Sequence, residues 1–203
     1  VTTVFVNMVA GPIDMNNGMF DLRQGHTTRV DESQPVPSTL VSEAARTLIA
    51  FSGVTILPDI PEYYRKYPAL LNFLSAQKMP WKESRTLAGE IGEYIVMMRE
   101  TEDAYLVGAA TNESGRTIDL PLSFLEKGKY TVEVIEDGDD AHYLTNRESL
   151  KVTTWQLTNN DKLALKLAPG GGACLVIKKT PSMRVGEQAA FPLVSPSGKI
   201  GRK

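Results

Sequence analysis

The sequence has little of what would mark several common classes of protein. It has a single cysteine among 203 residues, so no intrachain disulfide can form and cysteine usage does not indicate a compartment. No apolar run reaches the ~18–20 residues that a membrane-spanning helix needs. The formal net charge of −2 gives no general electrostatic reason to bind nucleic acid or an anionic membrane. We therefore expect no nucleic-acid partner and no membrane span.

Sequence motifs for cofactors and metals are also missing. There is no P-loop, zinc-ligand cluster or nucleophile elbow. The stretch APGGGA (168–173) precedes a strand-like run rather than a helix, which predicts a turn and not a phosphate site. His26 and His142 lie far apart in polar stretches, so neither is expected to bind a metal. Cys174 has apolar neighbours, as is typical of a buried structural thiol.

Residues 1–90 alternate strand-like and helix-like segments. The runs TTVFVNMVA (2–10) and VTILPDIP (54–61) are short, apolar and rich in β-branched residues, which predicts strands buried on both faces. Residues 38–53 show helical spacing after Ser38 or Thr39 as N-cap, and residues 62–77 are also helical in pattern. This order predicts part of a larger α/β domain with a parallel sheet, because two strands cannot close a barrel.

Residues 91–179 change to the pattern of an antiparallel β-sandwich. Seven short strand-like runs are separated by turn signals such as NESG, EKGK and PGGG. Leu163, Leu165 and Leu167 alternate with Ala164 and Lys166, as expected of a strand with one buried face. The predicted strands lie at 92–100, 104–111, 116–124, 129–137, 150–157, 161–168 and 172–179. Residues 180–203 hold three prolines and no periodicity, which predicts a disordered tail.

Polar residues after the two predicted barrel strands are the candidate site. Asp14 and Asp59 each follow a predicted strand at its carboxyl end, where active-site groups gather in α/β barrels. Asn16 and Asn17 follow Asp14 in the same loop, and we predict that all four bind substrate. Two alternatives stay open: Asp14 could close its strand as an Asx turn, and Asp59, between two prolines, could form a turn or cap a helix.

Five segments, in order, resemble glycoside hydrolase family 97. VNMVAGPIDMNNG resembles that family's FTRMLAGPMDYTPG, and WKESRTLAGEIGEYIVMMRE is similar to WDETRVLDGEIGEYVTIARR. The other three segments are SGVTILPDIPEYY, the stretch from AYLVGAATNESG to DDAHY, and LAPGGGACLVI. The resemblance covers roughly residues 1–178. Asn7, Thr55 and Lys82 stand where the family has arginine, glutamine and aspartate, which puts in question the sugar that the parent would accept.

The resemblance implies a fold of two classes, α/β plus all-β. Residues 1–90 would be the last two strands and helices of a (β/α)8 barrel, and residues 91–179 the C-terminal β-sandwich. Members of the family hydrolyse α-glucosides or α-galactosides, with inversion or retention, and bind calcium in the active site. Their catalytic carboxylates and calcium ligands precede the segments matched here. The resemblance therefore assigns no catalytic residue and no metal ligand to this chain.

We therefore expect the chain to be the C-terminal part of an α-glycosidase that acts on oligosaccharides. It would lack the upstream barrel and the N-terminal domain, open inside a domain at Val1, and be inactive alone. The resemblance implies a periplasmic or extracellular parent, although this chain opens without a signal peptide. The alternative is a non-catalytic carbohydrate-binding or interaction sandwich. That function requires two or more aromatic side chains aligned on one exposed sheet face, from the candidates Tyr94, Tyr105, Tyr130, Tyr143 and Trp155.

Overall fold

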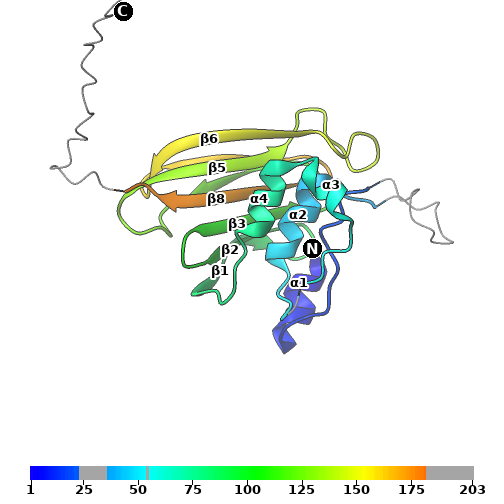
Figure 1. Cartoon of the computed structure of the whole chain (residues 1–203), viewed down its shortest axis with the longest axis horizontal. Coiled ribbons are helices and arrows are strands. Elements are labelled where there is room, and N and C mark those ends of the chain that lie inside the picture. The colour runs from blue at the N-terminus through cyan, green and yellow to red at the C-terminus, as the bar shows by residue number, and fades with distance from the viewer. Residues whose placement is uncertain (23–35, 54, 182–203) are drawn as a thin grey trace, which may run out of the picture.

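The computed structural model describes residues 1–22, 36–53 and 55–181, arranged in three layers (Figure 1). Helices pack on one face of a six-stranded sheet of order β1-β2-β3-β8-β5-β6, and a two-stranded sheet, β4-β7, packs on the other. All the described strand pairs are antiparallel. The strands are β1 (Glu83–Glu90), β2 (Tyr94–Glu100), β3 (Tyr105–Thr111), β4 (Arg116–Pro121), β5 (Lys129–Asp137), β6 (Leu150–Thr158), β7 (Lys162–Leu167) and β8 (Gly172–Lys179).

The seven strands predicted between residues 91 and 179 are confirmed as β2 to β8. Strand β1 was not predicted, because most of its residues are exposed and it carries polar side chains on both faces. It pairs with β2, so the large sheet begins at Glu83 rather than after residue 90.

The large sheet is buried on both faces, which explains the continuous apolar runs of its central strands. In β2, Ile95 and Met97 belong to the core under the helices, whereas Val96 and Met98 belong to the core under β4-β7. Cys174 is fully buried in the helix-side core, and this burial raises the pKa of its thiol well above the usual value. The prediction of a buried structural cysteine is confirmed.

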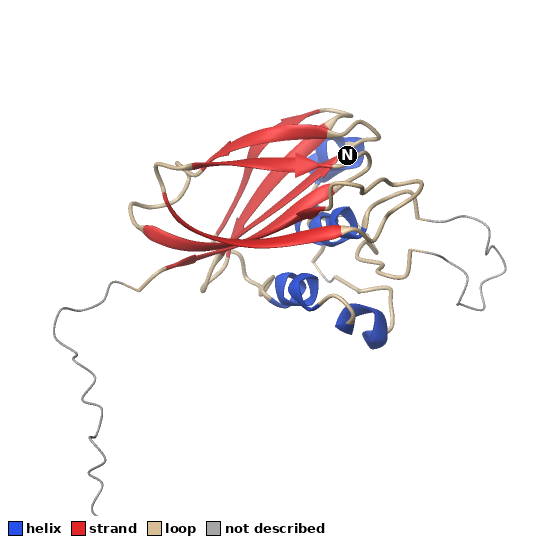
Figure 2. Cartoon of the chain, turned by 90° about the horizontal axis from the view of Figure 1, so that it is seen from above, coloured by secondary structure: helices blue, strands red, loops and turns tan. Residues whose placement is uncertain are grey.

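The helices lie together on one side of the sheet (Figure 2). Helix α2 (Leu40–Ile49) begins where predicted, since the Thr39 side chain accepts a hydrogen bond from the Ser42 backbone. The single helical segment predicted over 62–77 is instead two helices, α3 (Pro61–Arg65) and α4 (Pro68–Ser75). Pro68 has no N–H group to continue α3 and starts α4 instead.

The predicted barrel strands are not found. Residues 2–10 form helix α1 (Thr2–Val6) and the 3₁₀ helix η1 (Asn7–Ala10), and residues 55–60 form no strand. A short apolar run fits a helix as well as a strand, and a helix satisfies its own backbone groups where no neighbouring strand pairs with it. The partial barrel is therefore not confirmed, and the described fold is mostly antiparallel β-sheet.

Residues 23–35, which include His26, and the predicted tail from residue 182 onward fall outside the described residues. None of the helices in the described ranges is long and apolar enough to cross a bilayer.

Native-state hydrogen exchange should show that α2 is protected as strongly as β3 and β8. Nine of the ten α2 residues are buried against the sheet, whereas α1 has no buried residue, and local opening costs least where few apolar contacts are lost. We expect slow exchange for the amides of residues 43–49 and fast exchange throughout α1. Equal protection of α1 and α2 would contradict this packing.

Candidate functional site

The loop that carries the predicted site residues is fixed at Gly18. The Gly18 N–H donates to Glu43 Oε2 at 3.2 Å, and the Tyr64 hydroxyl donates to the Gly18 carbonyl at 3.0 Å. Gly18 has a φ of 97°, and a Cβ atom there would lie 2.9 Å from Thr47 Cγ2. Only glycine fits both this backbone conformation and this close approach to α2.

Asp59 is a structural hub of the same region. Its Oδ2 accepts hydrogen bonds from the backbone N–H groups of Phe20 at 2.9 Å and Asp21 at 2.6 Å. Its Oδ1 accepts from the N–H of Ile60, at the start of α3. The Asp59 N–H donates in turn to the Tyr64 hydroxyl, and burial raises the pKa of Tyr64 to about 12. Only the contact with Ile60 is local; the other two join Asp59 to backbone groups 38 and 39 residues away, so its carboxylate links two distant segments.

The other three predicted residues precede Gly18 in the same loop. Asp14 and Asn16 are exposed and Asn17 is half-buried. The loop is tied to the segment after α2, since the Ile13 N–H donates to the Phe51 carbonyl at 2.9 Å. The structure therefore places Asp14, Asn16 and Asn17 in the loop that Asp59 anchors. The binding of substrate by these four residues stays a prediction.

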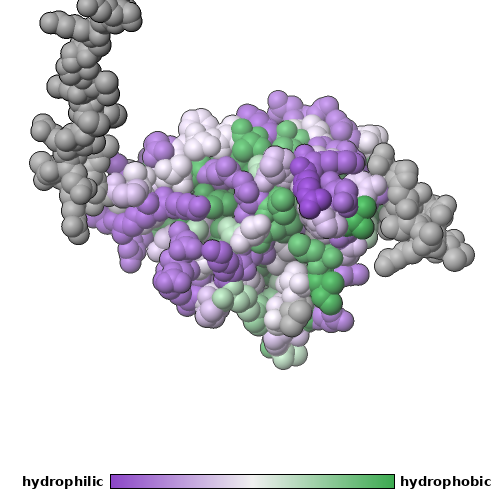
Figure 3. All heavy atoms as spheres, viewed as in Figure 1, coloured by the Kyte–Doolittle hydropathy of each residue, from purple (hydrophilic) through white to green (hydrophobic). Residues whose placement is uncertain are grey.

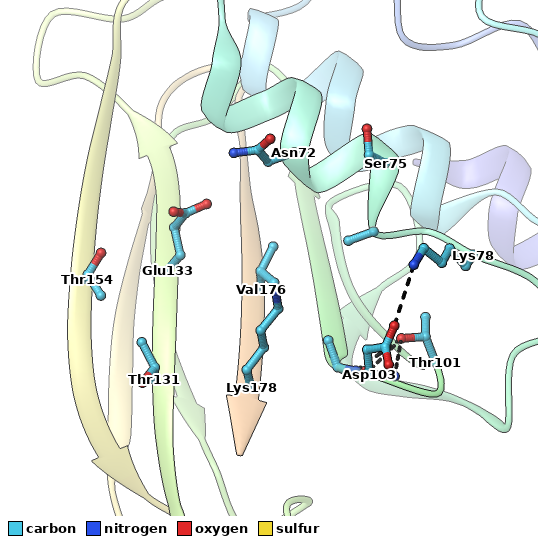
Figure 4. A pocket seen from close by; sticks show the side chains of 12 residues that line it. Asn72, Ser75, Lys78, Thr101, Asp103, Thr131, Glu133, Thr154, Val176 and Lys178 are labelled. Carbon is cyan, nitrogen blue, oxygen red and sulfur yellow. Dashed lines mark hydrogen bonds and ion pairs between the residues drawn. The ribbon is translucent and has the colours of Figure 1, made fainter. Parts of the chain in front are cut away.

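A polar groove lies between α4 and the open half of the large sheet (Figure 4). Its volume is about 570 Å³, and residues from β5, β6, β8 and α4 line it, among them Asn72, Thr131, Glu133, Thr154, Val176 and Lys178. Of its two carboxylates, Asp103 is paired with Lys78 at 3.6 Å, and strand β8 lies between Asp103 and Glu133. The groove thus does not present the two facing carboxylates of a glycosidase site.

The described residues hold no cluster of metal-ligating side chains. Over 1–22, 36–53 and 55–181, no group of three or more His, Cys, Asp or Glu side chains is placed to hold a metal ion. The calcium of the parent enzyme stays an expectation from the resemblance, with its ligands upstream of this chain.

Arg99 fixes the C-terminal end of α2 to the sheet. It extends from β2, is 5% exposed, and donates from Nε to the Leu48 carbonyl and from Nη2 to the Ile49 carbonyl, each at 3.2 Å. Its guanidinium also lies over the Trp81 ring, 4.5 Å from the centroid. Burial lowers the pKa of Arg99 to about 10, so the side chain is cationic at neutral pH.

Asp137 occupies the opposite end of α2. Its Oδ2 accepts from the N–H groups of Ala168 at 3.0 Å and Gly172 at 2.7 Å. A side chain on Gly171 would overlap this carboxylate, so the glycine triplet forms a cradle for Asp137 as well as a turn. Burial raises the pKa of Asp137 to about 6, although hydrogen bonds from these two backbone groups and from the Thr39 side chain act in the opposite direction.

Arg99 therefore holds the C-terminal end of α2 directly, whereas Asp137 acts on the other end through the side chain of the N-cap residue Thr39. An anion near the helix N-terminus and a cation at its C-terminus both complement the helix dipole. Sequence reasoning missed them, because Arg99 ends an apolar run and Asp137 opens an acidic turn. A charged residue at a position where the strand pattern predicts burial was the signal that could have identified Arg99.

The aromatic side chains of the sandwich do not form a binding platform. Tyr130 is fully buried and Tyr105 packs against it, while the Tyr94 ring lies under the Arg116 guanidinium. Trp155 is 50% exposed. The alignment that a carbohydrate-binding sandwich requires is thus absent from the described part of the chain.

Comparisons with known proteins identify relatives of this fold. The family described as "Glycosyl-hydrolase 97 C-terminal, oligomerisation" matches residues 80–178. A retaining alpha-galactosidase of Bacteroides thetaiotaomicron is 31% identical over 86% of this chain, and a probable retaining alpha-galactosidase of Streptomyces bingchenggensis is 27% identical over 68%. The structure of a glycoside hydrolase family 97 enzyme from Pseudoalteromonas, in complex with acarbose, matches 89% of this chain with a TM-score of 0.81 and 29% identity.

The chain spans about a quarter of the length of these relatives. The matched part is 26% and 20% of the two curated sequences and 28% of the Pseudoalteromonas structure. The resemblance to family 97 read from the sequence motifs is confirmed, and it extends to the described helices as well as to the sheet.

Replacing Arg99 with methionine should destabilise the fold strongly. The substitution Arg99→Met leaves the carbonyl groups of Leu48 and Ile49 without their side-chain donor and removes the cation from the Trp81 ring. We expect the free energy of unfolding to fall by about 2–4 kcal/mol, measured by urea denaturation. The control Arg85→Met removes an exposed pair with Glu83 and should cost less than about 1 kcal/mol; equal losses would contradict the role of Arg99.

Asp137 should make the stability of the protein depend on pH. Burial raises the pKa of Asp137 in the folded state to about 6, above the ordinary value of 3.8, so the folded chain holds this proton more tightly than the unfolded chain. The resulting stabilisation is complete below about pH 4 and is lost as the pH rises through 6.

We expect the free energy of unfolding of the wild type to fall relative to Asp137→Asn over this range, by up to about 3 kcal/mol. Denaturation series at several pH values measure this difference. Asp119→Asn, which neutralises a carboxylate that is 66% exposed, should parallel the wild type. Parallel curves for Asp137→Asn and the wild type would refute the assignment.

Proposed function

Because the chain belongs to glycoside hydrolase family 97, we propose that it is the C-terminal part of an α-glycosidase that hydrolyses α-galactosidic or α-glucosidic bonds. The observation that carries this proposal is the match of 86% of the chain to about a quarter of a retaining alpha-galactosidase. The catalytic carboxylates and the calcium site of the parent enzyme would lie upstream of Val1. The substrate would be an oligosaccharide with an α-linked terminal sugar.

The surface of the N-terminal part supports an upstream domain. Figure 3 shows green, apolar surface around α1 and beside α3, whereas the surface over α3 itself is hydrophilic. The exposed apolar side chains of this region are Val6, Val9, Ile56, Leu57 and Ile60, with exposed fractions from 38% to 85%. Apolar residues clustered on a surface in this way indicate a covering partner, and the upstream barrel of the parent enzyme is the partner that we propose.

In this proposal the sandwich braces the catalytic domain through α2. The helix is held to the sheet by Arg99, while Glu43 on the same helix binds the loop at Gly18. Because that loop carries Asp14, Asn16 and Asn17, the sheet fixes the position of the proposed rim of the sugar pocket. We also propose that the sandwich contributes to contacts between subunits, as the description of the matched family suggests.

An activity assay tests whether the catalytic groups lie in the upstream part of the enzyme and not in this chain. We expect the 203-residue chain to give no turnover of p-nitrophenyl α-galactoside or p-nitrophenyl α-glucoside, because acid–base assistance needs a pair of carboxylates that this chain would lack. The same chain expressed together with its upstream coding region should hydrolyse one of the two substrates. Turnover by the chain alone, or an upstream region without α-glycosidase activity, would overturn the proposal.

A further inference from the structure

The two edges of the large sheet differ in how far they are protected. An edge strand presents unpaired N–H and C=O groups, and proteins usually blunt such edges with bulges, charges or covering segments. Edge strand β1 has all three: a register shift between Thr86 and Ala88, the charged residues Glu83, Arg85 and Glu90, and the Phe5 ring of α1 packed against Gly89.

Edge strand β6 has fewer of these protections: in the described part of the chain it carries one charged residue and no register shift. It pairs with β5 over nine residues without a register shift, and no strand pairs with its other edge. Its one charged side chain is Lys151. Val152 and Trp155 are 43% and 50% exposed, so β6 combines a free hydrogen-bonding edge with exposed apolar side chains.

We propose that β6 is the surface through which two copies of this chain associate, edge to edge and antiparallel. This inference rests on the proposed role of the sandwich in subunit contacts and adds the surface that makes them. A two-fold axis perpendicular to the sheet joins two β6 strands into one continuous sheet, which is the usual closed symmetry of a dimer.

The symmetry also fixes the register of this pairing. Directly opposed residues must point to the same face of the sheet, and β6 (150–158) overlaps fully with its copy when Thr154 faces Thr154. Trp155 then faces Thr153, Val152 faces Gln156, and Lys151 faces Leu157. No like charges oppose each other in this register, so the strand can pair with a copy of itself without repulsion. The matched family is described by oligomerisation, which favours a second copy as the occupant.

The register predicts a pair of variants with opposite behaviour. The double variant Val152→Lys/Gln156→Lys places a lysine opposite a lysine twice across the axis, and like charges in directly opposed positions are destabilising. The matched control Val152→Lys/Gln156→Glu places a lysine opposite a glutamate twice. Both variants lose the same hydrogen bond from Gln156 to Thr131, so they differ only in the sign of one side chain.

Sedimentation velocity of the 203-residue chain at several concentrations tests the proposal, with circular dichroism and thermal unfolding to verify that each variant folds. We expect a wild-type dimer, a rise of about tenfold or more in the dimer dissociation constant for the lysine–lysine variant, and a dimer close to wild type for the lysine–glutamate variant.

The outcomes separate this inference from the proposed function. A wild-type dimer that both variants leave intact would overturn the β6 surface but not subunit contact by the sandwich. A monomeric wild type, or aggregates of undefined mass in all three proteins, would overturn both. Neither result alters the expected outcome of the α-glycosidase assay.

Discussion

The attachment of α2 to the large sheet is the contact on which the rest of the structure depends. The helix is buried on nearly all sides, and a buried helix needs partners for the polar groups at both of its ends. At the C-terminal end, Arg99 of the sheet donates to the last two carbonyl groups of α2. At the N-terminal end, the Leu40 N–H group donates to the Arg147 carbonyl and the Ser42 N–H group to the Thr39 side chain. Glu43, on the same helix, binds the loop at Gly18. The sheet therefore fixes the helix, and the helix fixes the loop that carries the candidate site.

Much of the sheet could be predicted from local pattern, because each strand from β2 to β8 carries its own apolar run between turn residues. Helix α2 could also be predicted, from the helical spacing of its apolar residues and from Thr39 as its N-cap. The segments 2–10 and 54–61 were not, because an apolar run of eight or nine residues is compatible with more than one backbone conformation. Only the presence or absence of neighbouring strands decides between them, and that information is not local.

The sequence placed Asp14 and Asp59 in one region, but it did not predict which groups their side chains contact. The chain does bring Asp59 beside the loop that carries Asp14. Sequence position cannot show whether a carboxylate accepts backbone hydrogen bonds or faces solvent, and Asp59 does the former. The roles of Arg99 and Asp137 were not predicted, because each binds a segment 30 or more residues away. Arg99 binds the C-terminal end of α2, and Asp137 binds the glycine triplet.

The position of α2 also separates two definitions of a domain. The family match begins at residue 80, yet α2 ends at Ile49 and forms much of the core on one face of the sheet. A polypeptide cut at the family boundary would keep every strand and still expose Ile95, Met97 and Leu106 to water. The region that the family model recognises is therefore smaller than the unit that buries its own core. The difference is α2 together with the other buried residues that precede residue 80, among them Phe20, Leu70 and Phe73.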